Sequence, residues 1–312
     1  MTISSSARRL AEFESCRQDL VALAYRMLGD MGRAEDMAQE AWLRWERHEV
    51  EADSPRAYLT TVVTRLCLNE LESARARREE SRADRLPEPV DLDEGGIPRV
   101  ERLEEISMAF MVLLQRLTPA ERAVLLLHDV FDFDHNEIAG LVGNNPAACR
   151  KLLERARQHI AVERRTLATR PDEHRRLLQA FVTAASAGDT RALVELLADD
   201  AIMISDGGAE GRVVGRQRNL PRPLQGAARI AAFVAAATTL GETELQVEEQ
   251  QLNGQPAIVF WTGDRPFAAL LLAVADGKIQ RVFFHADLSR LRYLGRRSGA
   301  RSLRSTPDRR DS

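Results

Sequence analysis

The sequence predicts a multidomain protein in which an all-α N-terminal half is joined to a C-terminal α+β domain. Three observations lead to this prediction. Residues 13–80 and 117–160 carry apolar side chains at helical spacing, with capping residues where the helices begin. Residues 83–100 are rich in proline, glycine and acidic side chains, which is typical of an irregular linker. From residue 172 onward, helical patterns are followed by four strand candidates, an order that favours an α+β domain.

Composition limits the classes of protein to which this chain can belong. At 312 residues it has room for two or three domains, and an apolar fraction of 44% is ordinary for a globular protein. The formal net charge is −3, so any nucleic-acid affinity has to come from local basic patches. Cys16, Cys67 and Cys149 lie far apart in apolar helical patterns, which indicates buried free thiols in a reducing cytoplasm.

The sequence gives no support for a membrane, metal or cofactor site. No apolar run approaches the length that spans a bilayer, and residues 1–13 lack an apolar signal core. The six histidines and three cysteines are scattered, without the spacing of a metal site. We therefore expect a cytoplasmic protein with no membrane contact, no metal and no cofactor.

Three helical patterns occupy residues 13–80. The first ends at Gly29, and the second, residues 34–47, has a stripe of small and aromatic side chains beside an acidic face. The third begins with Ser54 as N-cap and Pro55 at the first helical position, and it ends in arginines interleaved with glutamates. Taken alone, both charged faces are explained by solvation.

A helix-turn-helix is predicted within residues 117–160. Thr118 and Glu121 have the spacing of a capping box at the start of the first helix. A short second helix ends at Gly143, and Asn145 followed by proline starts a third, basic helix. Two helices joined by a glycine-containing turn, with cations on the second, indicate a DNA-binding unit whose last helix enters the major groove. A generic helical hairpin is the alternative.

Two sequence motifs carry a family resemblance. GDMGRAEDMAQEAWLRW, then SPRAYLTTVVTRLCLNELESARARRE, then the helix-turn-helix resemble in order the two conserved regions of bacterial extracytoplasmic-function (group IV) sigma factors. The resemblance covers half of the chain, and it is specific because both motifs occur in the family's order with a short linker. It implies a non-enzymatic protein that binds RNA polymerase core and promoter DNA. The implied limits are 13–80 for region 2, 81–103 for the linker and 104–165 for region 4.

The resemblance also implies a surface that binds RNA polymerase. The acidic-aromatic helix would dock on the coiled coil of the β′ clamp, while region 4 would meet the β flap. Carboxylates can face a basic coiled coil, and aromatic rings can bury an apolar seam. The implied residues of the helix are Asp36, Gln39, Glu40, Trp42 and Arg44. Trp42 and Trp45 belong either to this ridge or to the hydrophobic core.

Two promoter elements are assigned by the same resemblance. Unpaired bases of the minus-ten element would meet the third helix, through stacking surfaces, cations and amides supplied by Tyr58, Arg65, Asn69, Arg75, Arg77 and Arg78. The helix-turn-helix would read the minus-thirty-five element through Asn145, Arg150, Lys151 and Arg155. A solvated helix end remains the alternative for the arginines of the third helix, because glutamates offset much of their charge.

The C-terminal part resembles the extension of one sigma-factor subgroup. Leu86, Pro87, Glu88 and Pro89 resemble that subgroup's linker motif, although Arg85 stands where the subgroup has tryptophan. Residues 172–294 resemble a SnoaL-like, cystatin-related cone, with a curved antiparallel sheet. We expect helices at 172–187, 190–198 and 224–240 and strands at 201–205, 244–252, 256–262, 267–275 and 278–285. Residues 295–312 predict a disordered basic tail.

A cone of this kind can hold a pocket for an unknown small ligand. Its candidate lining is Asp206, Trp261, Arg265, His285 and Asp287. The pair His285 and Asp287 has the chemistry of an acid/base site, and solvated strand ends are the alternative. Two subgroup motifs are altered: one reads DGGAEG from Asp206, and the other reads HADLSRL from His285.

We therefore predict a sigma factor that directs promoter-specific transcription initiation and is modulated by its own SnoaL-like domain. In this hypothesis no separate anti-sigma factor is required. Two alternatives remain: a stand-alone helix-turn-helix regulator, which would leave the acidic helix 34–47 without a role, and a DNA-binding protein whose SnoaL-like domain is a small-molecule enzyme.

Overall fold

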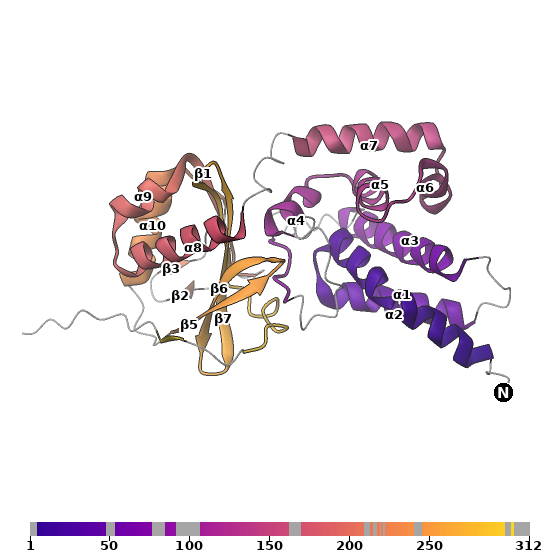
Figure 1. The fold of residues 1–312 in the computed structure, drawn as a ribbon, viewed down its shortest axis with the longest axis horizontal. Helices are drawn as coiled ribbons and strands as arrows, with labels where there is room; N and C mark the ends of the chain where they lie inside the picture. Colours follow the sequence, from indigo (N-terminus) through magenta and orange to yellow (C-terminus); the bar gives the residue numbers. More distant parts are fainter. Residues whose placement is uncertain are drawn as a thin grey trace, which may run out of the picture. The chain divides into compact units, whose positions relative to one another are not determined.

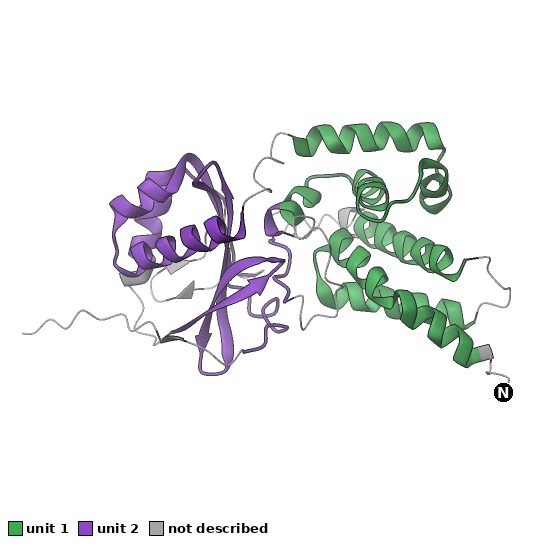
Figure 2. Ribbon diagram, in the orientation of Figure 1, with its two compact units in different colours: residues 1–83, 95–106, 110–164 green, residues 84–94, 107–109, 165–312 purple. Residues whose placement is uncertain are grey.

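The chain divides into two compact units. Unit 1 comprises residues 1–83, 95–106 and 110–164, and unit 2 comprises residues 84–94, 107–109 and 165–312 (Figure 2). The computed structural model describes residues 5–47, 54–76, 85–91, 107–161, 170–208, 213–214, 217–218, 220, 222–239, 245–296 and 301–302. Most of the linker predicted at 81–103 and most of the basic tail therefore lie outside the described residues.

The first half of unit 1 is a bundle of three helices. They are α1 (Ser5–Leu28), α2 (Met31–Glu46) and α3 (Pro55–Ala76). Asp30 caps α2 by accepting a hydrogen bond from the Arg33 amide at 2.9 Å, so the helix begins three residues before the predicted start. The small side chains Ala34, Ala38 and Ala41 are buried along α2, which allows it to pack closely on α1.

The second half of unit 1 contains the predicted helix-turn-helix. Its helices are α4 (Met108–Gln115), α5 (Pro119–Asp129), α6 (His135–Val142) and α7 (Pro146–Ala161) (Figure 1). The capping box of Thr118 and Glu121 is present, and Gly143 ends α6 in the left-handed region with φ 68°. Asn145 caps α7 through the Ala148 amide at 2.8 Å. These predictions are confirmed, whereas α4 was not predicted.

The described part of unit 2 contains three helices and a large sheet. The helices are α8 (Pro171–Ser186), α9 (Thr190–Leu196) and α10 (Ala227–Thr239). The strands are β1 (Leu197–Asp206), β2 (Val213–Val214), β3 (Gln217–Arg218), β4 (Leu224–Gln225), β5 (Gln246–Leu252), β6 (Gln255–Thr262), β7 (Arg265–Ala275), β8 (Lys278–His285) and β9 (Arg301–Ser302). The seven-stranded sheet has the order β4-β1-β8-β7-β6-β5-β9, and β2 pairs with β3. This is the predicted α+β architecture.

Three details of unit 2 correct the sequence prediction. The sheet is mixed and not antiparallel throughout, because β1 runs parallel to β8. The helix predicted at 190–198 ends at Leu196, since Leu197 takes an extended backbone and starts β1. The helix predicted at 224–240 starts at Ala227, because Leu224 pairs with β1. Gly226 adopts φ 99°, a conformation that separates this strand from the helix and that glycine tolerates.

The two faces of this sheet differ in chemistry. The helices α8, α9 and α10 lie on one side (Figure 1) and bury an apolar cluster that includes Phe181, Ile230 and Leu272. On the opposite face, five residues stand in register across five strands: Asp206, His285, Ala269, Val259 and Glu248. Three polar side chains, Asp206, His285 and Glu248, therefore lie in one row with two apolar ones on the face that the helices do not cover.

All three cysteines are buried and free. Among the residues that the structure describes, no helix has the length and apolarity needed to cross a membrane.

Candidate functional site

The acidic face of α2 presents polar side chains to solvent. Asp36 and Gln39 are exposed, and Glu40 accepts a hydrogen bond from Arg44 at 3.0 Å one helical turn later. Trp42 is half-buried with its ring 5.3 Å from that of Phe13, so part of the indole remains accessible on the helix that carries the acids. The predicted polymerase-binding residues therefore form one continuous surface on α2.

Trp45 has a different environment from Trp42. Its side chain is buried, its ring lies 5.3 Å from the ring of Tyr58, and its Nε1 donates to the Arg9 carbonyl at 3.2 Å. Trp45 is therefore a core residue. Tyr58 is half-buried against it, which leaves only part of the phenol ring available for stacking on a base.

The predicted minus-ten residues on α3 are only partly described. Arg65 and Asn69 are exposed on α3, one turn apart. The Arg65 guanidinium donates to the carbonyls of Gly140 and Leu141 at the end of α6. Arg75 belongs to α3, but its side chain is not among those that the structure describes. Arg77 and Arg78 lie outside the described residues.

The basic face of α7 is open to solvent. Arg150, Lys151 and Arg155 are all exposed, while Cys149 and Leu153 are buried under them. Asn145 is exposed too, but its side-chain oxygen is already used as the helix cap, which leaves its amide nitrogen for another contact. The structure therefore places three predicted minus-thirty-five cations on one helix surface.

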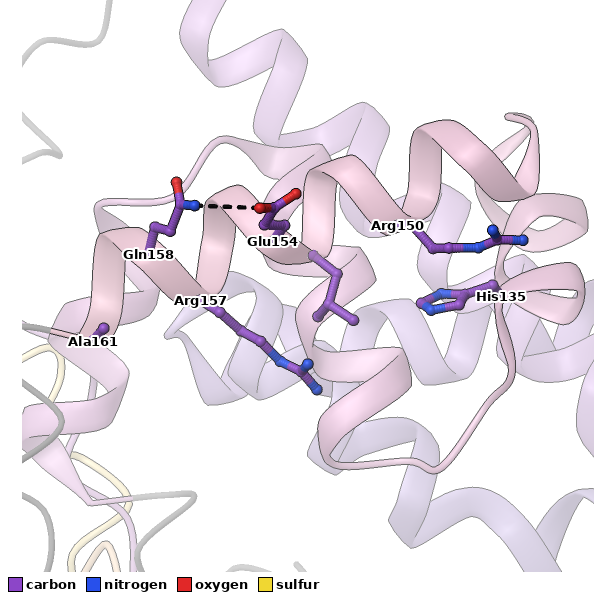
Figure 3. Close-up of a pocket in the computed structure, with 7 residues that line it drawn as sticks. His135, Arg150, Glu154, Arg157, Gln158 and Ala161 are labelled. Carbon is purple, nitrogen blue, oxygen red and sulfur yellow. Dashed lines mark hydrogen bonds between the residues drawn. The ribbon is translucent and has the colours of Figure 1, made fainter.

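A hollow of about 430 Å³ adjoins this basic face (Figure 3). Its lining includes His135, Arg150 and Arg157, and the His135 ring stacks on His128 with a centroid distance of 4.8 Å. Arg157 is paired with Asp129, which also accepts from His128. Loss of hydration lowers the pKa of His135, and electrostatic interactions with His128 and Arg150 lower it further. Sequence reasoning missed His135, whose only signal was its position at the start of α6.

The predicted linker motif is fixed within unit 2. Leu86 donates its amide to Asp206 Oδ2 at 3.0 Å, while Arg290 donates to the Leu86 carbonyl. The other oxygen, Asp206 Oδ1, accepts from the Gly208 amide at 3.0 Å. Burial raises the pKa of Asp206, and the two amide donors and Arg290 oppose that rise. We call Asp206, Arg290 and the Leu86 backbone the linker clamp.

A second contact fixes the end of the linker motif. Val90 donates its amide to Asn253 Oδ1 at 3.1 Å, and Val90 accepts from the Asn253 amide at 2.8 Å. Asp91 then forms a β-bridge with Leu252. Asn253 adopts φ 51° in the Asn-Gly turn after β5, a conformation that asparagine tolerates better than most residues. The segment 86–91 is therefore anchored at both ends, and all of its residues are buried.

The candidate pocket residues do not form one cluster. Trp261 and His285 are each 1% exposed and share the sheet face of Asp206, opposite the helices. Arg265 is exposed at the start of β7. Asp287 accepts from the amide and hydroxyl of Ser289, and a side chain on Gly208 would meet its carboxylate at 3.1 Å. The two altered subgroup motifs, at Asp206 and at His285, therefore pack against one another.

His285 is deeply buried and uncharged at neutral pH. Burial lowers its pKa to about 3, and neither ring nitrogen has a hydrogen-bond partner within the described part of the chain. Asp206 is its direct neighbour on β1, but both carboxylate oxygens are occupied by backbone amides. Because neither ring nitrogen has a partner, His285 is hydrogen-bonded neither to Asp206 nor to Asp287, with which it was predicted to form an acid/base pair.

Comparisons with known proteins give the class of the molecule. The family model described as Sigma-70 region 2 matches residues 13–77, and the one described as Sigma-70, region 4 matches residues 107–160. These ranges coincide with the α1–α3 bundle and with α4–α7. The two modules in this order define an RNA polymerase sigma factor, a protein that binds the polymerase core and promoter DNA.

Relatives of similar length narrow this class. The chain is 37% identical to the ECF RNA polymerase sigma factor SigJ of Mycobacterium tuberculosis (strain ATCC 25618 / H37Rv) over 286 residues, 86% of this chain and 89% of that protein. It is 33% identical to the probable ECF RNA polymerase sigma factor SigI of the same strain over 276 residues, 87% and 91% of the two chains. This chain belongs to the extracytoplasmic-function sigma factors.

A solved structure extends the likeness to most of the chain. The crystal structure of Mycobacterium tuberculosis SigJ matches with a TM-score of 0.70 and 28% identity, over 91% of this chain and 98% of that one. The match therefore includes unit 2 as well as the two sigma-70 modules. The family and fold class predicted from the sequence are confirmed.

Proposed function

We propose that the activity of this sigma factor is divided among three surfaces. The first is the face of α2, where Asp36, Gln39, Glu40, Trp42 and Arg44 would dock on the coiled coil of the β′ clamp. This docking assignment is supported by the exposure of the side chains. The acids and part of Trp42 are accessible, whereas Trp45 is buried in the core. A carboxylate-rich helix attracts a basic coiled coil, and the indole edge adds a small apolar contact.

The second surface reads promoter DNA. Arg150, Lys151 and Arg155 on α7 would enter the major groove of the minus-thirty-five element, with region 4 resting on the β flap. Arg65, Asn69 and Tyr58 on α3 would meet unpaired bases of the minus-ten element, together with the undescribed Arg75, Arg77 and Arg78. The single observation that carries this proposal is the open basic face of α7, which has exposed cations over a buried apolar stripe.

The third surface is regulatory and belongs to unit 2. The linker clamp and the Val90–Asn253 contact attach the segment between the two sigma-70 modules to the sheet. Unit 2 would thereby control how freely the modules reach polymerase and promoter, and no separate anti-sigma factor would be required. Because both Asp206 oxygens accept backbone amides, we assign Asp206 to anchoring the linker and not to small-molecule catalysis.

Reconstituted transcription with bacterial core polymerase tests these assignments. Asp36→Arg should reduce promoter-dependent transcripts at least tenfold, because it puts a cation against a basic coiled coil. Asp172→Arg, the same change on an exposed residue of α8, is the matched control. Equal transcript levels from the two variants would exclude the α2 assignment.

A second variant pair tests the regulatory assignment in the same assay. Asp206→Ala and Arg290→Gln each remove one side of the linker clamp. Both should change the amount of transcript in the same direction, and the sign gives the direction of control by unit 2. Unchanged transcripts across a promoter panel would contradict regulation through this clamp.

A further inference from the structure

Two arginines, one from each half of unit 1, donate hydrogen bonds to backbone carbonyls of the other half. Arg65 on α3 donates from Nε to the Leu141 carbonyl at 3.3 Å and from Nη2 to the Gly140 carbonyl at 3.2 Å, in the last turn of α6. In the other direction, Arg122 on α5 donates to the Met27 carbonyl in the last turn of α1. Each sigma-70 module therefore supplies an arginine to the C-terminal end of a helix in the other module.

Helix C-termini have the right chemistry for such contacts. The last four carbonyls of an α-helix lack intrahelical donors, and the helix dipole places partial negative charge on them. Arginine offers several N–H donors in a planar fork, so one side chain can satisfy two adjacent carbonyls. In α6 the fork of Arg65 covers two consecutive carbonyls just before the left-handed Gly143.

The contact around Arg122 shows that the two modules pack tightly at this point. Arg122 is 7% exposed, and burial lowers its pKa to about 10, so it stays charged at neutral pH. A third cation crosses the same boundary, since Arg26 lies over the ring of Phe131 with 5.7 Å between guanidinium carbon and ring centroid. Arg122 and Arg26 are the buried members of this set, whereas Arg65 is the exposed one.

The Arg65 guanidinium therefore has two competing partners, the end of α6 and promoter DNA. In the proposed function it faces single-stranded DNA of the minus-ten element, but here two of its donors are used by α6. A helix C-terminus and a DNA backbone both present oxygen acceptors with negative charge, so they compete for the same guanidinium. The exposed position of Arg65 allows that exchange, which a buried arginine such as Arg122 would resist.

We propose that Arg65 is a latch that holds α6 of the helix-turn-helix against α3 in the free sigma factor. The latch opens when the guanidinium exchanges the Gly140 and Leu141 carbonyls for unpaired promoter DNA. The exchange rests on the proposed function of α3, whereas the closed contact can be measured without DNA.

The closed contact can be tested in the full chain by energy transfer between two dyes. Glu35 on α2 and Gln158 on α7 are exposed, so Glu35→Cys and Gln158→Cys provide labelling sites while the three native cysteines are buried. Arg65→Ala should raise the ratio of open to closed molecules at least fivefold, the factor that corresponds to about 1 kcal/mol, the net value of one ordinary hydrogen bond. The control is Arg17→Ala, an exposed arginine on α1.

Two outcomes of this experiment decide the latch. An unchanged ratio in Arg65→Ala overturns it, whatever the variant does in transcription. Arg65→Lys should also open the chain, because a single ammonium cannot reproduce the two-carbonyl fork. Circular dichroism of each variant verifies that the helices are retained, so an open chain is not confused with an unfolded one.

The exchange with DNA has its own test. A single-stranded oligonucleotide from the non-template strand of a minus-ten element, taken from a promoter that the sigma factor transcribes, should open the wild-type chain. It should open Arg65→Ala no further, and the variant should bind it at least threefold more weakly. If the strand binds both chains equally, the exchange is refuted while the closed contact stands. If it binds neither, the minus-ten assignment of α3 fails instead.

Discussion

Two groups of charged side chains, one on α7 and one in unit 2, differ in what they already contact. On α7, Arg150, Lys151 and Arg155 are exposed above a buried apolar stripe, so their donors are available to a partner. In unit 2, Asp206 is buried, and backbone amides occupy both of its oxygens. The comparison teaches that exposure distinguishes a binding surface from an internal anchor better than residue type does. Four predictions test it, beginning with the largest effect.

Acid should destabilise unit 2 through its buried histidines. Burial lowers the pKa of His285 to about 3 and that of His174 to about 4, from an ordinary value of 6.5. Below pH 6.5 the unfolded chain binds protons that the folded chain excludes. The free energy of unfolding should therefore fall as the pH drops, by up to about 1.4 kcal/mol per pH unit for each histidine. The contribution is fully present above pH 6.5.

Urea unfolding of the full chain between pH 7 and pH 5 measures this effect. His285→Gln should remove the share of the pH dependence that belongs to His285 and leave that of His174. His159, which is exposed on α7, provides the control change His159→Gln. A pH dependence that is the same in His285→Gln and in the wild type would show that His285 is hydrated in the folded chain.

Removing the carboxylate of the linker clamp should have the next largest effect. Asp206→Ala leaves the buried amides of Leu86 and Gly208 without their acceptor, which should cost about 2 kcal/mol. Hydrogen exchange at the Leu86 amide, measured by nuclear magnetic resonance, should accelerate accordingly. Asp206→Asn should accelerate it less, since one oxygen remains. Asp200→Asn, an exposed change on the same strand, should leave the rate as it is, and a similar acceleration there would contradict a local anchor.

The exposed cations of α7 should matter for binding and not for stability. Arg150→Ala should weaken promoter binding by the holoenzyme about tenfold, as for the loss of one base or phosphate contact, with an unchanged unfolding midpoint. Electrophoretic mobility shifts at fixed salt measure the affinity. Arg191→Ala, on an exposed residue of α9, is the control. A loss of stability in Arg150→Ala would mean that this side chain is structural.

The smallest effect is expected for the ion pair on α2. Both Glu40 and Arg44 retain more than 40% exposure of their side chains, so water screens the attraction. Arg44→Ala should change the free energy of unfolding by less than about 0.5 kcal/mol. Its effect on polymerase affinity should be larger than this, if α2 is the docking face. Thermal unfolding and a polymerase binding titration, run on the same preparation, separate the two contributions.

Local chemistry explains what the sequence predicted well. The capping box at Thr118 and Glu121, the stop at Gly143 and the cap at Asn145 each depend on residues within one turn. Strands β5 to β8 were predicted within a few residues because Asn253-Gly254 and Asp276-Gly277 mark tight turns between alternating or continuous apolar runs. The candidate α7 cations followed from the same helical periodicity.

Long-range pairing explains what the sequence did not predict. Helix α4 is apolar on nearly every side, so no amphipathic period marks it. The parallel pairing of β1 with β8 joins residues far apart in the chain, and Leu86 meets Asp206 across 120 positions. Arg65 was predicted as a DNA contact, but its bonds to Leu141 and Gly140 of α6 span 76 and 75 positions. Such contacts depend on the folded topology and leave no local pattern.

The docked linker also sets the reach of the chain on its two sides. From Ala76, the last residue of α3, to Arg85 the chain advances nine residues, and from Asp91 to Ser107 it advances sixteen. A fully extended peptide covers at most about 3.5 Å per residue, so the two tethers can span roughly 30 Å and 55 Å. Docking therefore divides one connection into two of unequal length.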